Sequence, residues 1–181
     1  MQIREQLKEM FQMQRTLNQN ILKEFGQEAM TEEKLQMAII DELGELTHEL
    51  KGDWCWWKKS QAPVNRQRVL EELVDVYHFV MTYEMCYGYK NNESIEVILN
   101  FYEDDIDEYY VRLLLPLSHA IREILDNNCK LTDLLILSGL LGFKFDEIYQ
   151  EYLNKNKINY ERLKNGYWYG SWKVIGTKWF L

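Results

Sequence analysis

The sequence predicts an all-α protein, and three observations lead to that prediction. Apolar residues recur at three- and four-residue steps over several long segments, as they do on amphipathic helices. No segment shows alternating strands and helices, and no internal repeat is found. Because 46% of the 181 residues are hydrophobic, the chain can bury a core without disulfides or a structural metal, so we expect a single domain over residues 1–181.

The first expected helix lies at the N-terminus. Its apolar stripe runs from Ile3 to Phe25, and Gly26 marks its end. Gln14 and Asn18 interrupt the inward face of this stripe with polar side chains.

The second and third helices are expected from Thr31 to Lys51 and from Arg66 to Tyr87. The Thr31 hydroxyl is suited to capping the second helix. The segment 52–65 has no helical period, and we expect it to be a loop short enough to make these helices antiparallel neighbours. This loop is unusually aromatic, with Trp54, Trp56 and Trp57.

The C-terminal half contains four further expected helices. They run over residues 94–101, 109–125, 132–141 and 146–163. Pro116 predicts a kink or a break in the second of them, and a break near Asn154 is an alternative to one continuous last helix. Residues 166–181 alternate aromatics with Gly and Ser, so short strands or a docked, extended tail over 168–181 are expected there.

Charge and cysteine content limit the class of partner and the compartment. A net charge of −8 and a pI near 5.0 argue against nucleic-acid binding, which needs clustered Lys and Arg. A small anionic substrate remains compatible, because a bound divalent cation can reverse the sign of an acidic pocket. Cys55, Cys86 and Cys129 are odd in number and widely spaced, which favours a reducing cytosol over a disulfide framework or a zinc site.

No targeting or membrane segment is expected. The first ten residues are polar and lack the basic start and apolar stretch of a signal peptide. No apolar run approaches the roughly 20 residues that span a bilayer. We therefore expect a cytoplasmic protein without a membrane partner.

Two pairs of acidic residues have helical spacing. Glu42 and Glu45 are three residues apart, as are Glu72 and Asp75, so each pair lies on one helix face beside apolar positions. Across two antiparallel helices they would form a four-carboxylate cluster, which takes up protons or binds cations, and oxygen ligands favour Mg²⁺. Such pairs also occur on solvated helix faces, and spacing alone does not decide between the two interpretations.

Two neighbouring residues have open roles. Glu49 lies one turn beyond Glu45 and either joins the cluster or remains a surface residue beside Lys51. His78, three residues after Asp75, either bonds a carboxylate, contacts substrate, or packs in the interior.

Four motifs occur in a meaningful order between about residues 10 and 167: MQRTLN, GELTHELKGDWCWWKK, LEELVDVYHF and LGFKFDEIYQEYLNKNKINYERLKNGY. Together they resemble the motifs of the dimeric all-α dUTPases, which belong to the MazG-like nucleoside triphosphate pyrophosphohydrolases. The resemblance implies a helical bundle of the MazG-like type, a homodimer, and Mg²⁺-dependent hydrolysis of dUTP, and also dUDP, to dUMP.

The resemblance also implies roles for individual residues. The metal ligands it implies are Glu42, Glu45, Glu72 and Asp75. The residues that contact the substrate phosphates are Lys155, Asn159, Arg162 and Tyr167. Those around the base are Gln14, Asn18 and Trp56.

The chemistry of these residues agrees with the implied roles. Asn159 and Arg162 follow Lys155 by four and seven residues, so on a helix all three face one side, toward an anion. A solvated basic helix end is the alternative. Gln14 and Asn18 are donors and acceptors suited to a uracil edge, with an interhelix hydrogen bond as their alternative.

Three positions depart from the family pattern. Trp54 replaces a Lys, Asp53 replaces an aromatic residue, and Leu163 replaces a Gln. The lost Lys removes a positive charge near the phosphates, for which the retained Lys58 can compensate. These departures bear on substrate identity more than on metal binding.

We predict attack on the substrate by a metal-activated water, with two or more Mg²⁺ ions. Glu45, or Glu49 as the alternative, accepts the proton, while Lys155 and Arg162 stabilise charge on the phosphates. Two other functions stay open: hydrolysis of another nucleotide such as dCTP, and a regulatory role in which the aromatic segments bind a protein partner.

Overall fold

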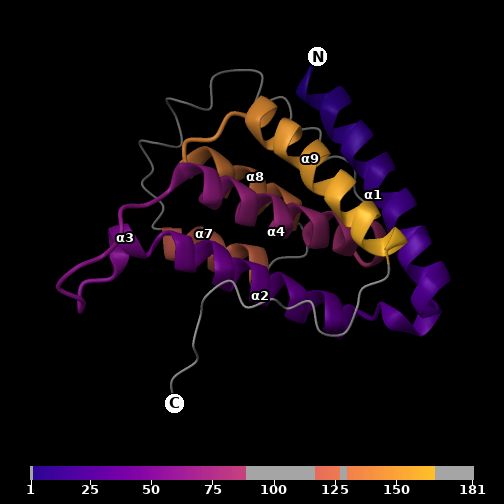
Figure 1. Ribbon diagram of the computed structural model, residues 1–181, viewed down its shortest axis with the longest axis horizontal. Coiled ribbons are helices and arrows are strands. Elements are labelled where there is room, and N and C mark those ends of the chain that lie inside the picture. Colours follow the sequence, from indigo (N-terminus) through magenta and orange to yellow (C-terminus); the bar gives the residue numbers. More distant parts are fainter. Residues whose placement is uncertain (1, 89–116, 127–129, 166–181) are drawn as a thin grey trace.

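The protein is described by a computed structural model, in which residues 2–88, 117–126 and 130–165 have a defined placement (Figure 1). All regular structure in those residues is helical, which confirms the predicted fold class. The elements are α1 (Ile3–Phe25), the 3₁₀ turn η1 (Gln27–Ala29), α2 (Glu32–Glu49), α3 (Lys51–Trp54), α4 (Arg66–Cys86), α7 (Leu117–Asp126), α8 (Lys130–Leu140) and α9 (Phe145–Lys164).

Helix α4 is the central element of the bundle. It packs against α1, α2, α8 and α9, and it lies between them in Figure 1. Its side chains are buried around most of the helix, as expected for a helix with neighbours on several sides. Those that are fully buried include Leu73, Val74, Val76, Tyr77, Val80 and Met81. A helix in this position can present one face to α2 and another to α9.

Helices α1 and α9 lie side by side and run in the same direction (Figure 1). Gln6 Nε2 donates to Asp146 Oδ1 at 2.5 Å near their N-termini. One turn further along, the Tyr149 hydroxyl donates to Glu9 Oε2 at 2.8 Å. These contacts set the register between the two helices, and with it the position of the polar residues that follow.

The helix ends follow the sequence signals. Gly26 ends α1 with φ of +89°, a conformation that glycine adopts without strain. The Thr31 hydroxyl accepts a hydrogen bond from the Lys34 amide at 3.4 Å, so the predicted cap of α2 is confirmed. Asn65 Oδ1 caps α4 by accepting from the amides of Gln67 and Arg68.

Two expectations about the elements need correction, and one is confirmed. Residues 51–54 form the short helix α3, so the segment expected to be a loop begins with one helical turn, which the Trp54 indole stabilises by donating to the Thr47 carbonyl at 2.8 Å. The expected continuous last helix is confirmed, because α9 continues through Asn154 without the alternative break. Helix α8 begins at Lys130, two residues before the predicted Thr132.

Several expectations lie outside the described residues. These are the helix over 94–101, the kink at Pro116 and the tail over 168–181. None of the helices in the described part of the chain has both the length and the apolar composition of a membrane span.

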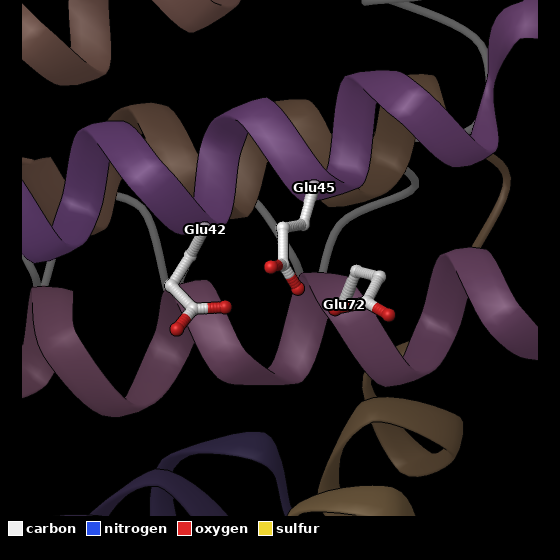
Figure 2. A group of neighbouring side chains, drawn as sticks. All are labelled: Glu42, Glu45 and Glu72. Carbon is white, nitrogen blue, oxygen red and sulfur yellow. The ribbon is translucent and has the colours of Figure 1, made fainter. Parts of the chain in front are cut away.

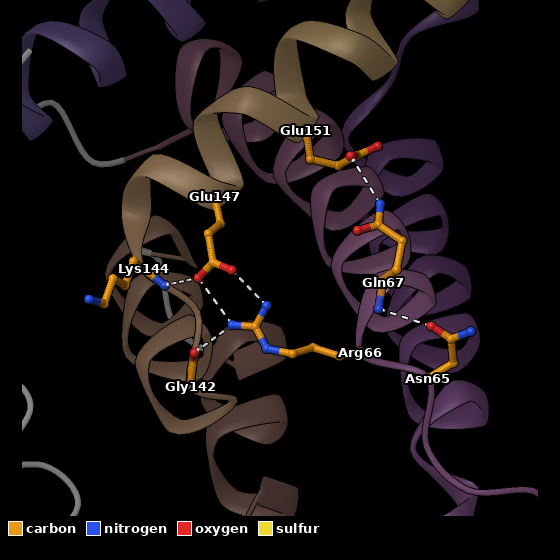
Figure 3. A network of polar contacts seen from close by, with 7 residues as sticks. All are labelled: Asn65, Arg66, Gln67, Gly142, Lys144, Glu147 and Glu151. Carbon is orange, nitrogen blue, oxygen red and sulfur yellow. Dashed lines mark hydrogen bonds and ion pairs between the residues drawn. The ribbon is translucent and has the colours of Figure 1, made fainter.

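Arg66 joins the start of α4 to the turn before α9 (Figure 3). Its guanidinium donates to both carboxylate oxygens of Glu147, at 2.6 and 3.0 Å, and to the Gly142 carbonyl at 2.8 Å. The same group lies 4.2 Å from the centre of the Phe143 ring. The turn itself uses Gly142 with φ of +74°, so these contacts hold α9 at a defined angle to α4.

Candidate functional site

Three carboxylates converge between α2 and α4. Glu42 and Glu45 extend from α2, and Glu72 extends toward them from α4 (Figure 2). One ligand atom from each lies within 4.8 Å of the other two. The antiparallel packing of two acidic helix faces therefore places these groups where one hard cation can contact all three.

The charges of this cluster are costly without a cation. Burial is the main cause that raises the pKa of Glu42 to about 8, and repulsion from Asp75, Glu45 and Glu72 adds to it. Burial, followed by repulsion from Asp75 and Glu45, likewise raises the pKa of Glu72 to about 7. Near neutral pH the metal-free cluster therefore retains protons that a divalent cation would displace.

Asp75 lies beside this cluster but is already paired. Its Oδ2 lies 2.5 Å from Lys155 Nζ of α9, and both side chains are less than one-fifth exposed. Burial raises the pKa of Asp75, whereas the hydrogen bond and charge of Lys155 and the charge of Arg162 oppose that rise. Helix α9 thus brings the positively charged side chains of Lys155 and Arg162 to the edge of the acidic cluster.

A cavity of about 550 Å³ opens next to the carboxylates, between α1, α2, α4 and α9. This volume is in the range of small-molecule sites. Its acidic side is formed by Glu42 and Asp75, and α9 contributes Asn159 and Arg162. Its other polar lining residues include Gln14, Asn18, His78 and Thr82. The cavity therefore combines a cation-binding edge, basic and amide groups, and a separate polar wall.

The polar wall is a hydrogen-bonded network between α1, α4 and α9. Gln14 Nε2 donates to Asn18 Oδ1 at 2.9 Å and to Thr82 Oγ1 at 3.1 Å. Gln14 Oε1 lies 2.6 Å from His78 Nδ1 and accepts from the Tyr152 hydroxyl at 2.7 Å. Gln14 and Asn18 thus make interhelix hydrogen bonds and also line the cavity; their role toward a base stays a prediction.

A comparison with protein families identifies the family of the chain. A family model described as dUTPase matches residues 6–167, which include every element that lines the cavity. The chain belongs to the dUTPase family. A search of curated proteins found no match. The family assigns the chain a dUTP diphosphatase activity, and it confirms the resemblance carried by the four sequence motifs.

Within this dUTPase, the residues expected around the phosphates fall into two groups. Lys155, Asn159 and Arg162 lie on one continuous helix, and two of them line the cavity while Lys155 contacts Asp75. The predicted common face of these three residues is therefore present in α9. Tyr167 lies outside the described residues.

Three predicted site residues do not line the cavity. Trp56 is 87% exposed and, like the exposed Lys58, follows α3 without lining the cavity. Glu49 is held by Arg68, whose Nε lies 3.0 Å from Glu49 Oε2. The single chain therefore does not bring Trp56 and Lys58 to the cavity, and it gives Glu49 an ion-pair partner.

Sequence reasoning did not single out three residues that the structure places at the candidate site. Asp41 lines the cavity next to Glu42, Thr82 lies at the centre of the polar network, and Tyr152 bonds Gln14 from α9. Thr82 follows His78 by one helical turn, which was an available signal for a shared face. Tyr152 carried no such local signal, because its partner lies 138 residues away.

Proposed function

We propose that the protein hydrolyses dUTP, and dUDP as a second substrate, to dUMP in a Mg²⁺-dependent reaction that releases pyrophosphate from dUTP. The observation that carries this proposal is the convergence of Glu42, Glu45 and Glu72 beside a cavity that also receives Arg162. Removing dUTP from the nucleotide pool would limit the entry of uracil into DNA. The expected compartment is the cytoplasm.

The donor atoms fit a hard divalent cation. All three clustered ligands are carboxylate oxygens, and burial has already raised the pKa values of Glu42 and Glu72, so a cation relieves their repulsion. We assign Glu42, Glu45, Glu72 and Asp75 as the ligands, with Asp75 leaving Lys155 when it binds the ion. When bound, Mg²⁺ neutralises phosphate oxygens and lowers the pKa of water.

Glu45 is the proposed acceptor of the proton from the attacking water, and Glu49 is the alternative. Glu45 is an exposed member of the cluster and points into the space between α2 and α4 (Figure 2). Glu49 is bound to Arg68 and must release it before it can act. The ion pair therefore favours Glu45.

Lys155, Asn159 and Arg162 are the proposed phosphate contacts, together with Tyr167. Lys155 and Arg162 would stabilise negative charge as it develops on the phosphates. Asn18 and His78 line the polar wall, where they would contact the nucleoside part of the substrate. Gln14 supports that wall.

The protein is further proposed to act as a homodimer. Trp54, Trp56 and Trp57 pack on one another, with ring centroids 5.5 and 5.8 Å apart, yet remain 39%, 87% and 56% exposed. A second copy would cover this aromatic surface and would explain how Trp56 and Lys58 reach a substrate. Sedimentation velocity at micromolar concentration tests this, and a monomer would contradict it.

A nucleotide panel tests the proposed activity. The purified protein is incubated with Mg²⁺ and each deoxynucleoside triphosphate, and pyrophosphate is measured. We expect turnover with the highest kcat/KM for dUTP, and loss of turnover in EDTA and in Glu72→Gln. Glu71→Gln is the matched control, because Glu71 lies next to Glu72 and bonds Gln67 instead. A higher kcat/KM for dCTP would reject dUTP as the preferred substrate, and no turnover of any nucleotide would reject the enzyme.

A further inference from the structure

One ring nitrogen of His78 has no hydrogen-bond partner among the described residues. The side chain is only 5% exposed and lines the cavity, and its ring stacks on Tyr152 with centroids 4.4 Å apart. Nδ1 faces Gln14, whereas Nε2 is buried and has no hydrogen-bond partner among the described residues. A buried polar atom without a partner is costly, so its chemical state is informative about the ligand.

The state of Nε2 follows from the hydroxyl of Thr82. That hydroxyl has one hydrogen, and its shortest acceptor is the backbone carbonyl of His78 at 2.8 Å, against 3.3 Å to Asn18 Oδ1. Because its hydrogen is used there, Thr82 Oγ1 can act toward the Gln14 side chain only as a hydrogen-bond acceptor. The end of the Gln14 amide that faces Thr82 is therefore its NH₂ group.

The orientation of Gln14 then determines the tautomer of His78. Because the NH₂ group faces Thr82 and Asn18, the carbonyl oxygen faces His78 Nδ1, and a carbonyl oxygen can only accept. Tyr152 strengthens this orientation by donating its hydroxyl to the same oxygen at 2.7 Å. His78 Nδ1 must carry the hydrogen, and Nε2 carries a lone pair.

The electrostatic environment keeps the imidazole neutral. Burial, with a smaller contribution from the charge of Lys155, lowers the pKa of His78 to about 3. In a neutral ring with hydrogen on Nδ1, Nε2 can act only as an acceptor, and His78 is one of the residues that line the cavity. Gln14 itself offers nothing more, because both of its N–H groups and both lone pairs of its oxygen are already used.

We propose that Thr82 and Tyr152 are positioning residues that fix Gln14 and His78 so that His78 Nε2 accepts a hydrogen bond from an N–H or O–H donor of the bound nucleoside. Two donors fit this chemistry, the imide N3–H of uracil and the 3′-hydroxyl of the sugar. A ligand that lacks the donor leaves Nε2 unsatisfied and is rejected. This inference rests on the proposed function for the identity of the ligand, but the tautomer does not.

The first test reads the tautomer directly. In protein labelled with ¹⁵N-histidine, protonated and unprotonated ring nitrogens give separate NMR signals. Assignment uses His48→Gln and His119→Gln, because these two residues do not line the cavity. We expect hydrogen on Nδ1 of His78 and none on Nε2. Hydrogen on Nε2 of the wild-type protein would overturn the inference, whether or not dUTP is hydrolysed.

The second test identifies the donor with the product dUMP and two analogues. We expect the Nε2 signal to shift when dUMP binds. If the donor is N3–H, N3-methyl-dUMP removes that shift; if it is the sugar hydroxyl, 2′,3′-dideoxy-UMP removes it. The analogue without the donor should bind about tenfold more weakly, as for one lost hydrogen bond to a buried partner. A dUMP complex that leaves the Nε2 signal unchanged would overturn the inference.

The positioning role is tested by Tyr152→Phe, which keeps the stacked ring and removes only the hydroxyl. Tyr149→Phe is the matched control, because Tyr149 also lies on α9 and donates to α1, but at Glu9, outside the cavity lining. We expect a mixture of His78 tautomers and a several-fold loss of dUMP affinity in Tyr152→Phe and neither change in Tyr149→Phe. Thr82→Val should act in the same way. Equal behaviour of Tyr152→Phe and Tyr149→Phe in both measurements would show that Tyr152 is merely structural.

Discussion

Lys155 Nζ of α9 lies 2.5 Å from Asp75 Oδ2 of α4, so a lysine side chain is held at the edge of the acidic cluster. In Lys155→Met the apolar stem is largely retained and the charge is lost. We expect kcat/KM for dUTP to fall about a hundredfold, because a charge that stabilises the phosphates is missing. The free energy of unfolding should also fall by about 1–3 kcal/mol, since Asp75 loses its partner.

Lys157→Met is the control for this variant. Lys157 lies on the same helix but is exposed. The Lys157→Met variant should keep both kcat/KM and the denaturation midpoint near the wild-type values. If Lys155→Met retains full kcat/KM, its contact with Asp75 is structural and the proposed phosphate role is wrong.

A second prediction separates the two candidate proton acceptors. Glu45 belongs to the cluster, whereas Glu49 is bound by Arg68. Glu45→Gln should reduce kcat by at least about a hundredfold, in line with the loss of general-base assistance. Glu49→Gln should reduce it less than about tenfold. Steady-state kinetics with saturating Mg²⁺ measures both, and the opposite order would assign the proton to Glu49.

Much of the fold could be predicted because local sequence signals act within single helices. The apolar periodicity and the Thr31 cap placed α2, and the same periodicity placed α4, within a few residues of their ends. The turn of α3 escaped prediction because four residues carry no measurable periodicity, and it is stabilised by the indole of Trp54 reaching back to Thr47.

The site was predictable to the extent that its residues share a helix. The spacing of Glu42 and Glu45 predicted one half of the cluster, and that of Glu72 and Asp75 predicted the other. The expected antiparallel packing of the two helices brings Glu72 to the first pair. The contacts of Lys155 with Asp75 and of Tyr152 with Gln14 depend on how α9 packs against α4 and α1, which no local pattern encodes. Only the family motifs indicated that Lys155 belongs to the same site.

A third prediction concerns the junction formed by Arg66. Arg66→Ala removes the contacts with Glu147 and Gly142 and should lower the free energy of unfolding by about 1 kcal/mol, because the pair is exposed. That corresponds to about 2–4 °C in Tm for a chain of this size. No residue of this junction lines the cavity, so kcat/KM should stay within about twofold of wild type. A much larger loss of activity would show that the angle of α9 depends on this contact.

The fourth prediction is a loss of stability of the metal-free protein as pH rises. The pKa of Glu42 is about 8 in the folded state against a model value of 4.5, so the folded protein binds more protons between these values. Stability therefore falls as pH rises through this interval and levels off above pH 8. The lowered pKa of His78 has the opposite effect, but only below its model value of 6.5. The window from about pH 6.5 to 8 isolates the carboxylate effect.

Thermal unfolding in EDTA and in Mg²⁺ measures this effect. In EDTA, Tm should fall between pH 6.5 and 8 in wild type and fall less in Glu42→Gln, which removes the carboxyl group whose pKa is raised to about 8. At pH 8 the variant should be more stable than wild type by about 1 kcal/mol, since a repelled and partly buried charge is gone. Mg²⁺ should raise the Tm of wild type more at pH 8 than at pH 6.5, because the ion then displaces fewer protons. Equal Mg²⁺ effects in wild type and Glu42→Gln would show that Glu42 is not a ligand.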